Sequence, residues 1–202
     1  MRHAILMMTA AGLALAVAGC HNRNNEATSA ESSAGNAAEA TGNAISNAAT
    51  DVKEAVTPTP TGQEFADRAA KSDAFEIASA KLAREKSGSA DIKSFADMMI
   101  KDHTASTAKI KEAAGEASPK ITPDPTLTDD QNSKLADLRK LSGADFDKEY
   151  VSQQIDAHKS ALSLMQLYAD KGDVASLKTT AGAIAPIVQS HLDKIRAIKD
   201  RQ

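Results

Sequence analysis

Residues 89–114 read SADIKSFADMMIKDHTASTAKIKEAA, and their apolar side chains recur every three or four positions. This spacing is typical of an α-helix with one buried face, because such a helix turns once every ~3.6 residues. Ser89 stands where its side chain can cap the first turn, and Asp91 is well placed near the positive end of the helix dipole. The inward stripe consists of Ile92, Phe95, Ala96, Met99, His103, Ile110 and Ala114. The segment therefore predicts a long amphipathic helix with a histidine in the middle of its buried face.

A second long helix is predicted before this one. Thr61 and Glu64 form a capping box at its start, and Gly88 ends it. Its stripe has the same spacing and consists of Phe65, Ala69, Ser72, Phe75, Glu76, Ser79, Leu82 and Ala83. The two segments are expected to form a helical hairpin.

The region after residue 114 predicts a long connection and a short helix. Prolines at 119, 123 and 125 exclude a helix from residues 118–127. Thr128 and Gln131 then form another capping box, which opens a short helix that ends at Leu141. The pair Ser142-Gly143 is expected to break or kink the helix at this point, before the next long helix begins.

Two further long helices complete the pattern. The first ends at Gly172, and Asp173 is expected to cap the second, which Pro186 should kink. No stretch of the folded region alternates as a strand does. The expected fold is all-α, a ferritin-like four-helix bundle with one extra short helix, over residues 63–202. The direction of the third long helix relative to the second stays open.

The composition excludes several classes of protein. The chain has 202 residues, a net charge of −3 and a pI near 6.0, and only 3% of its residues are aromatic. A nucleic-acid binder would need a basic stripe and stacking platforms, so no nucleic-acid partner is expected. The single cysteine, Cys20, excludes an internal disulfide and a zinc site built from cysteines.

Residues 1–19 have the features of a bacterial lipoprotein signal peptide. A short basic start precedes an apolar run too short to span a membrane, which ends in Val17-Ala18-Gly19-Cys20. This ending resembles the lipobox, whose cysteine carries acyl chains such as palmitate. The resemblance implies a membrane anchor on Cys20 and, with His21 rather than aspartate after it, an outer membrane lipoprotein of the cell envelope that faces the periplasm. Residues 20–62 are rich in small and polar residues and are expected to be a disordered, lipid-anchored linker.

Four ionisable residues fall on the inward faces, one on each long helix: Glu76, His103, His158 and His191. Buried charges must be paired, hydrogen-bonded or liganded. One interpretation is a hydrogen-bond network in which Glu76 accepts from the histidines or from neighbouring serines. Another is a transition-metal site for zinc, copper or iron, and a third is general acid–base catalysis. Counted from Gly172, His158 and His191 differ in depth by about 7 Å, so they are expected to lie in different layers unless the helices are offset.

Met99 and His103 are four residues apart and share a helix face, which would suit copper, although methionine at this spacing commonly fills a core. Asp102 is expected to point to solvent.

Several motifs together resemble a known family. The stretches 65–70, 95–104, 141–150 and 184–192 are similar, in order, to the bacterial domain of unknown function family 4142, whose members are called predicted outer membrane proteins. The resemblance covers roughly residues 63 to 198 and implies a ferritin-like bundle in the envelope, without an established reaction. Di-iron ferritins carry Glu-x-x-His pairs, whereas Ile100, Ile155 and Val188 precede the three histidines here by three residues. This departure argues against iron storage or oxidation.

The sequence thus predicts an envelope lipoprotein with a non-catalytic binding or stress-associated module, and no enzyme. The alternative is a metal-binding protein that uses Glu76, His103, His158, His191 and Met99. The sequence does not identify a protein partner.

Overall fold

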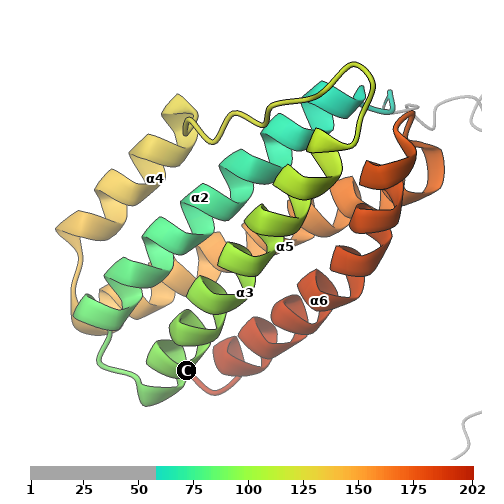
Figure 1. Ribbon diagram of the computed structural model, residues 1–202. Helices are drawn as coiled ribbons and strands as arrows, with labels where there is room; N and C mark the ends of the chain where they lie inside the picture. Colours follow the sequence, from blue (N-terminus) through green and yellow to red (C-terminus); the bar gives the residue numbers. More distant parts are fainter. Residues whose placement is uncertain (1–57) are drawn as a thin grey trace, which may run out of the picture. The chain divides into compact units, whose positions relative to one another are not determined.

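The computed structural model describes residues 58–202, which form five helices (Figure 1). Their bounds are α2 (Gly62–Lys86), α3 (Ala90–Gly115), α4 (Asp129–Lys140), α5 (Gly143–Lys171) and α6 (Ala175–Lys199). The described part contains no strand, so the prediction of an all-α bundle with one short extra helix is confirmed. The predicted signal peptide, Cys20 and most of the predicted linker lie outside the described residues. None of the described helices combines the length and the apolar character needed to cross a membrane.

Both predicted capping boxes form. Thr61 Oγ1 accepts from the Glu64 N–H at 3.3 Å, and the Glu64 carboxylate accepts from the Thr61 N–H at 2.8 Å. Thr128 and Gln131 make the equivalent pair of bonds at 3.2 and 3.0 Å. These local signals therefore place the starts of α2 and α4 correctly.

The predicted cap on the last helix is wrong. α6 begins with Val174 at its N-cap position and has no side-chain cap. Asp173 instead accepts a hydrogen bond from the Tyr168 hydroxyl at 2.8 Å, which ties the end of α5 to the turn. The break before α5 forms as predicted, and Gly143 adopts a φ of 58°, a conformation that favours glycine.

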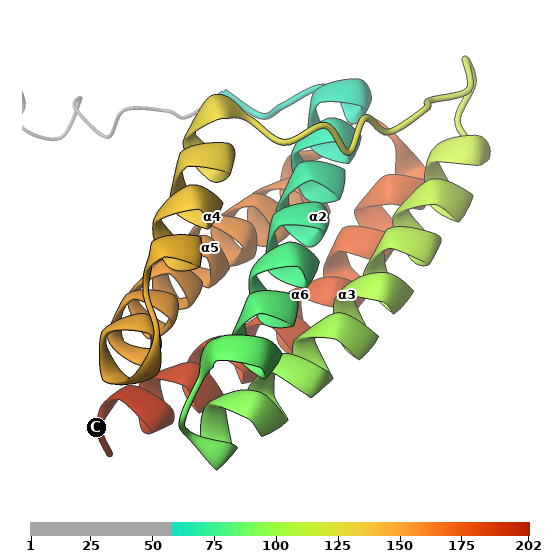
Figure 2. The ribbon, with the colours of Figure 1, turned by 90° about the vertical axis from the view of Figure 1, so that its left-hand side faces the viewer.

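The helices form two antiparallel hairpins, α2–α3 and α5–α6, which pack side by side (Figures 1 and 2). Residues 116–128 and α4 carry the chain back along the bundle, so that α5 runs parallel to α3. This answers the open question of direction. α2 contacts α5, α3 contacts α6, and α4 covers α2 and α5 from outside. A single crossover between two hairpins is the connectivity of ferritin-like bundles.

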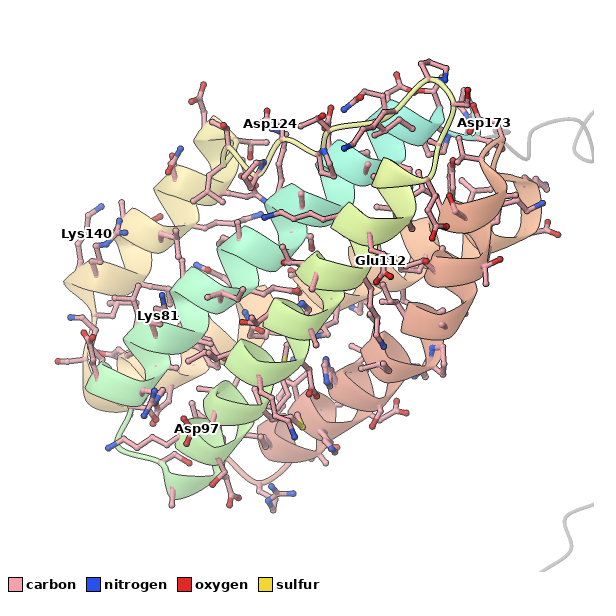
Figure 3. All side chains as sticks on the ribbon, viewed as in Figure 1. Lys81, Asp97, Glu112, Asp124, Lys140 and Asp173 are labelled. Atoms are coloured by element: carbon pink, nitrogen blue, oxygen red, sulfur yellow. The ribbon has the colours of Figure 1, made fainter. Side chains whose placement is uncertain are left out.

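Helix α6 continues through Pro186, which has no N–H for the helical hydrogen bond. The helix changes direction along its length in Figure 1, in agreement with the predicted kink. Charged side chains such as Asp97, Glu112 and Lys140 lie on the outer faces of the helices (Figure 3).

The core consists of two apolar clusters, one toward each end of the bundle. The first apolar cluster includes Phe95, Met99 and Tyr150, and the second includes Phe65, Leu164 and Tyr168. Between them lies a polar layer, defined as the buried residues Glu76, His103, Gln154, His158 and His191. The candidate site is therefore held midway along the helices, with apolar packing on both sides.

Gly172→Ala should lower the free energy of unfolding by about 1–3 kcal/mol, because a Cβ there would lie 2.6 Å from the Tyr168 backbone oxygen. Tyr168 is stacked on Phe65 and cannot easily give way. Gly182→Ala is the matched control, since its Cβ would meet only Ala169 at 3.8 Å, and it should stabilise the helix by about 1 kcal/mol. Urea denaturation of both variants checks this pair, and equal effects would contradict it.

Candidate metal centre

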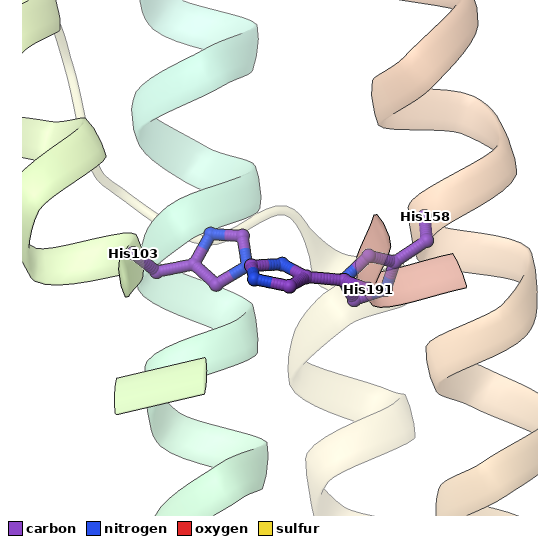
Figure 4. Close-up of side chains that lie close together, drawn as sticks. All are labelled: His103, His158 and His191. Carbon is purple, nitrogen blue, oxygen red and sulfur yellow. The ribbon is translucent and has the colours of Figure 1, made fainter. Parts of the chain in front are cut away.

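Each of the four long helices places one ionisable side chain in the polar layer. Glu76 comes from α2, His103 from α3, His158 from α5 and His191 from α6, and their exposed fractions are 0%, 4%, 0% and 2%. The three imidazole rings meet at the centre of the bundle (Figure 4), with centroids 5.5–5.8 Å apart. One potential ligand atom from each ring lies within 4.8 Å of those of the other two. The inward positions of these four residues agree with the sequence prediction.

The expectation that His158 and His191 lie in different layers is wrong. Counted from the true helix ends, His158 lies 13 residues before Lys171 and His191 lies 16 residues after Ala175. The remaining difference of three residues is about 4.5 Å along the axis. Side chains lean toward the N-terminus of their helix, so His158 leans away from the turn and His191 leans toward it. The two rings therefore reach the same depth.

Each histidine uses one ring nitrogen to bond its surroundings. His103 Nδ1 donates to Asp73 Oδ1 at 2.8 Å, His158 Nδ1 to the Gln154 backbone oxygen at 2.8 Å, and His191 Nε2 to Asp102 Oδ2 at 3.0 Å. The second nitrogens, Nε2 of His103 and of His158 and Nδ1 of His191, are buried and have no hydrogen-bond partner among the described residues. Histidines that bind metals show this division, because the outer bond orients the ring and the inner nitrogen faces the ion.

Two of the orienting residues were not identified from the sequence. Asp73 lies three residues before Glu76 on α2, so helical spacing alone could have placed it on the same face. Asp102 was expected to point to solvent, but its side chain is only 31% exposed and contacts His191. The cause is tertiary, because α6 packs against α3 and brings His191 to it.

Glu76 lies behind two of the rings. Its Oε2 is 2.9 Å from His103 Nδ1 and its Oε1 is 3.4 Å from His158 Nδ1. Neither oxygen receives an aligned hydrogen bond, because those two N–H groups point to Asp73 and to the Gln154 backbone. Ser79 does not serve Glu76 as a carboxylate partner either, since its hydroxyl donates to the Glu76 backbone oxygen at 3.1 Å. Glu76 is therefore held by charge rather than by hydrogen bonds.

The pKa values of Glu76 and His103 move in opposite directions. Burial raises the pKa of Glu76, but the positive charges of His103, His158 and His191 outweigh it and lower the pKa to about 2. Burial also lowers the pKa of His103, yet Glu76 and Asp73 outweigh it and raise the pKa to about 10. The two groups are therefore a buried ion pair at neutral pH.

The pKa of His191 shifts in the direction opposite to that of His103. Burial lowers its pKa to about 4, against the raising effect of the Asp102 hydrogen bond. Its ring is therefore neutral at pH 7. Burial also raises the pKa of Asp73, and the hydrogen bond from His103 opposes this rise.

Met99 lies in the first apolar cluster and is fully buried there. It does not line the cavity that borders the histidines. The Met99 side chain therefore packs in the apolar core, as methionines at this helical spacing commonly do.

A cavity of about 280 Å³ adjoins the polar layer on the side of the second apolar cluster. His103 and His191 form part of its wall, together with the acidic residues Asp73, Glu76 and Asp102. The exposed residues Ala105, Lys109 and Ile187 stand at its mouth. The remaining wall is mainly apolar and includes Ala69, Ala161, Leu164, Met165, Ile184 and Val188.

Comparison with known protein families identifies the family of this chain. The model of the family described as a domain of unknown function (DUF4142) matches residues 46–198. The chain belongs to this family. The match confirms the resemblance seen in the motifs and extends it toward the N-terminus, whereas a search of curated protein sequences finds no match.

Two solved structures are similar to this family member. They are described as CopM in the Cu(I)-bound form and CopM in the Cu(II)-bound form. The Cu(I) form has a TM-score of 0.59 and 16% identity, and the match covers 70% of this chain and 97% of that chain. The Cu(II) form has a TM-score of 0.60 and 16% identity, with 71% and 99% covered. At this identity the likeness establishes a shared fold.

Proposed function

We propose that this domain binds one divalent transition-metal ion, with Cu²⁺ as the preferred ion and Zn²⁺ as the next, through His103, His158 and His191. The observation that carries the proposal is the set of three buried imidazole nitrogens without partners, each on a ring whose other nitrogen is already bonded. In this proposal the domain holds the ion and does not turn over a substrate.

The donor set favours these ions on chemical grounds. Imidazole suits zinc, copper, iron and nickel, whereas soft thiolate or thioether ligands select Cu(I). The described part contains no cysteine, and Met99 lies in the first apolar cluster, although Met165 lines the cavity beside His103 and His191. Among divalent ions the general order of affinity peaks at Cu²⁺. The two similar structures hold copper, one as Cu(I) and one as Cu(II), which supports copper as the metal but does not favour either oxidation state. Glu76 supplies charge compensation beside the rings.

Calorimetric titration of the metal-free protein with Cu²⁺ and with Zn²⁺ tests the proposal. We expect one ion per chain, and we expect Cu²⁺ to displace Zn²⁺. Elemental analysis of the protein after purification and gel filtration should find the same stoichiometry. A protein that retains no metal above buffer, and whose thermal stability neither ion changes, would refute the proposal.

Metal binding at pH 7 should release about one proton per ion, because the raised pKa of His103, about 10, leaves its ring protonated before the ion arrives. His191 releases none, since its pKa of about 4 keeps it neutral. The apparent affinity should accordingly rise about tenfold per pH unit between roughly pH 7 and 9. Titrations in buffers of different ionisation enthalpy count the protons, and a release of zero would contradict the assignment of His103.

We also propose that the domain is presented in the cell envelope by a lipid anchor on Cys20, at the outer membrane and facing the periplasm. The support is the lipobox-like sequence before Cys20, which lies outside the described residues. Cys20→Ser should abolish incorporation of labelled palmitate and move the protein from the membrane to the soluble fraction. Unchanged labelling of this variant would overturn the assignment.

A further inference from the structure

The three histidines leave a metal ion short of a full set of ligands. Zn²⁺ in proteins is commonly four-coordinate, and sites with three protein ligands keep the fourth position for water or an exchangeable molecule. Glu76 is not placed to supply this ligand, because it lies against Nδ1 of His103 and of His158, whereas their free nitrogens are the Nε2 atoms. Within residues 58–202, no further histidine, cysteine or acidic residue joins the group of three rings.

The cavity lies where an outside ligand could complete the set. His103 and His191 belong to its wall, and its mouth is bounded by exposed residues, so a small molecule can reach the rings from solvent. A cavity of about 150 Å³ holds a benzene molecule, and this cavity measures about 280 Å³. It therefore has room for a small ring with substituents, and its apolar wall favours an apolar body.

The charges around the cavity indicate the class of ligand. Asp73, Glu76 and Asp102 line the cavity, and their negative charges repel an anionic ligand. Imidazole-type nitrogens suit zinc and copper, and a neutral base of this kind can bind the ion without bringing further negative charge beside these carboxylates.

From these observations we infer that the metal ion keeps one exchangeable coordination position that faces the cavity and takes a small neutral nitrogen base with an apolar body, of the imidazole type. This inference rests on the proposed metal site. It makes the domain a receptor for a metal–ligand pair rather than a closed metal store.

The test uses the Cu²⁺-loaded protein, with 4-methylimidazole as the neutral probe and azide as the anionic probe. Addition of 4-methylimidazole should shift the visible absorption and the EPR spectrum of Cu²⁺ and leave the ion bound after gel filtration. Azide should bind about tenfold more weakly or worse, because of the surrounding carboxylates.

A matched pair of substitutions on α3 locates the ligand. Ala105 and Ala108 are both exposed, but only Ala105 borders the cavity. Ala105→Phe should obstruct the mouth and weaken 4-methylimidazole binding about tenfold or more, whereas Ala108→Phe should leave it unchanged. Calorimetry of each variant with Cu²⁺ alone shows whether its metal site is intact.

The outcomes separate the two proposals. If Cu²⁺ binds but 4-methylimidazole changes neither spectrum, the inference fails and the metal-binding function stands. Equal ligand binding by the Ala105→Phe and Ala108→Phe variants would also overturn it, because the ligand would then lie elsewhere. If Cu²⁺ does not bind, both proposals fail.

Discussion

His158→Asn should reduce the affinity of the protein for Cu²⁺ more than about 100-fold, because loss of a bond outside the ligand shell already costs about 10–100-fold. The asparagine amide can still donate to the Gln154 backbone oxygen, as His158 Nδ1 does at 2.8 Å. It lacks any atom in place of Nε2, the nitrogen that has no partner. The variant therefore removes the metal ligand while it keeps the hydrogen bond that holds the side chain.

Two aspartates on α3 provide the comparison for this experiment. Asp102→Asn removes the charge that orients His191 and should weaken Cu²⁺ binding about tenfold. Asp97→Asn is the control, because Asp97 pairs with Arg84 on the surface at 2.8 Å and is 60% exposed. Calorimetric titration of the three variants should rank them in this order, with Asp97→Asn equal to the unmodified protein. An unchanged affinity in His158→Asn would remove this residue from the metal site.

Glu76→Gln should lower the free energy of unfolding of the metal-free protein by about 3–5 kcal/mol, because it leaves the charged His103 ring buried without one partner. The loss should fall toward the lower end of this range, since Asp73 still accepts from His103 at 2.8 Å. Asp97→Asn again serves as the control and should leave the stability unchanged. Urea denaturation after chelator treatment measures the difference.

The effect of Glu76→Gln should depend on pH in a defined direction. The folded pKa of Glu76, about 2, lies below its ordinary value of 4.5, so its stabilisation is complete above pH 4.5 and is lost as the pH falls through 2. The folded pKa of His103, about 10, lies above its ordinary 6.5, so its stabilisation is complete below pH 6.5 and is lost as the pH rises through 10. The difference between the two proteins should therefore be largest between pH 4.5 and 6.5. A difference that is constant from pH 5 to pH 10 would contradict the ion pair.

The fold could be predicted from local features of the chain. The capping boxes at Thr61 and Thr128 act within one helical turn, and the helical stripes depend only on spacing, so neither needs knowledge of distant residues. The prediction at Asp173 was wrong because a side chain from the preceding turn, Tyr168, binds that carboxylate. A pattern of capping residues does not show whether another side chain will bind the residue expected to cap the helix.

The candidate site was predicted only in part. The inward positions of Glu76, His103, His158 and His191 follow from the helical period. The partners of the rings do not, because Asp73 reaches His103, and Asp102 reaches His191, across interhelical contacts. The same holds for the cavity, whose wall takes residues from four helices.

By itself the sequence determined which residues form helices, which face each helix buries and which polar groups must leave water, because these depend on periodicity and on neighbours within one turn. Only the tertiary structure decided that the three imidazoles share one depth, which nitrogens stay free and that Glu76 lies behind the rings. The physical reason is that axial offset and side-chain lean between packed helices set distances of a few ångströms. A metal site depends on those distances.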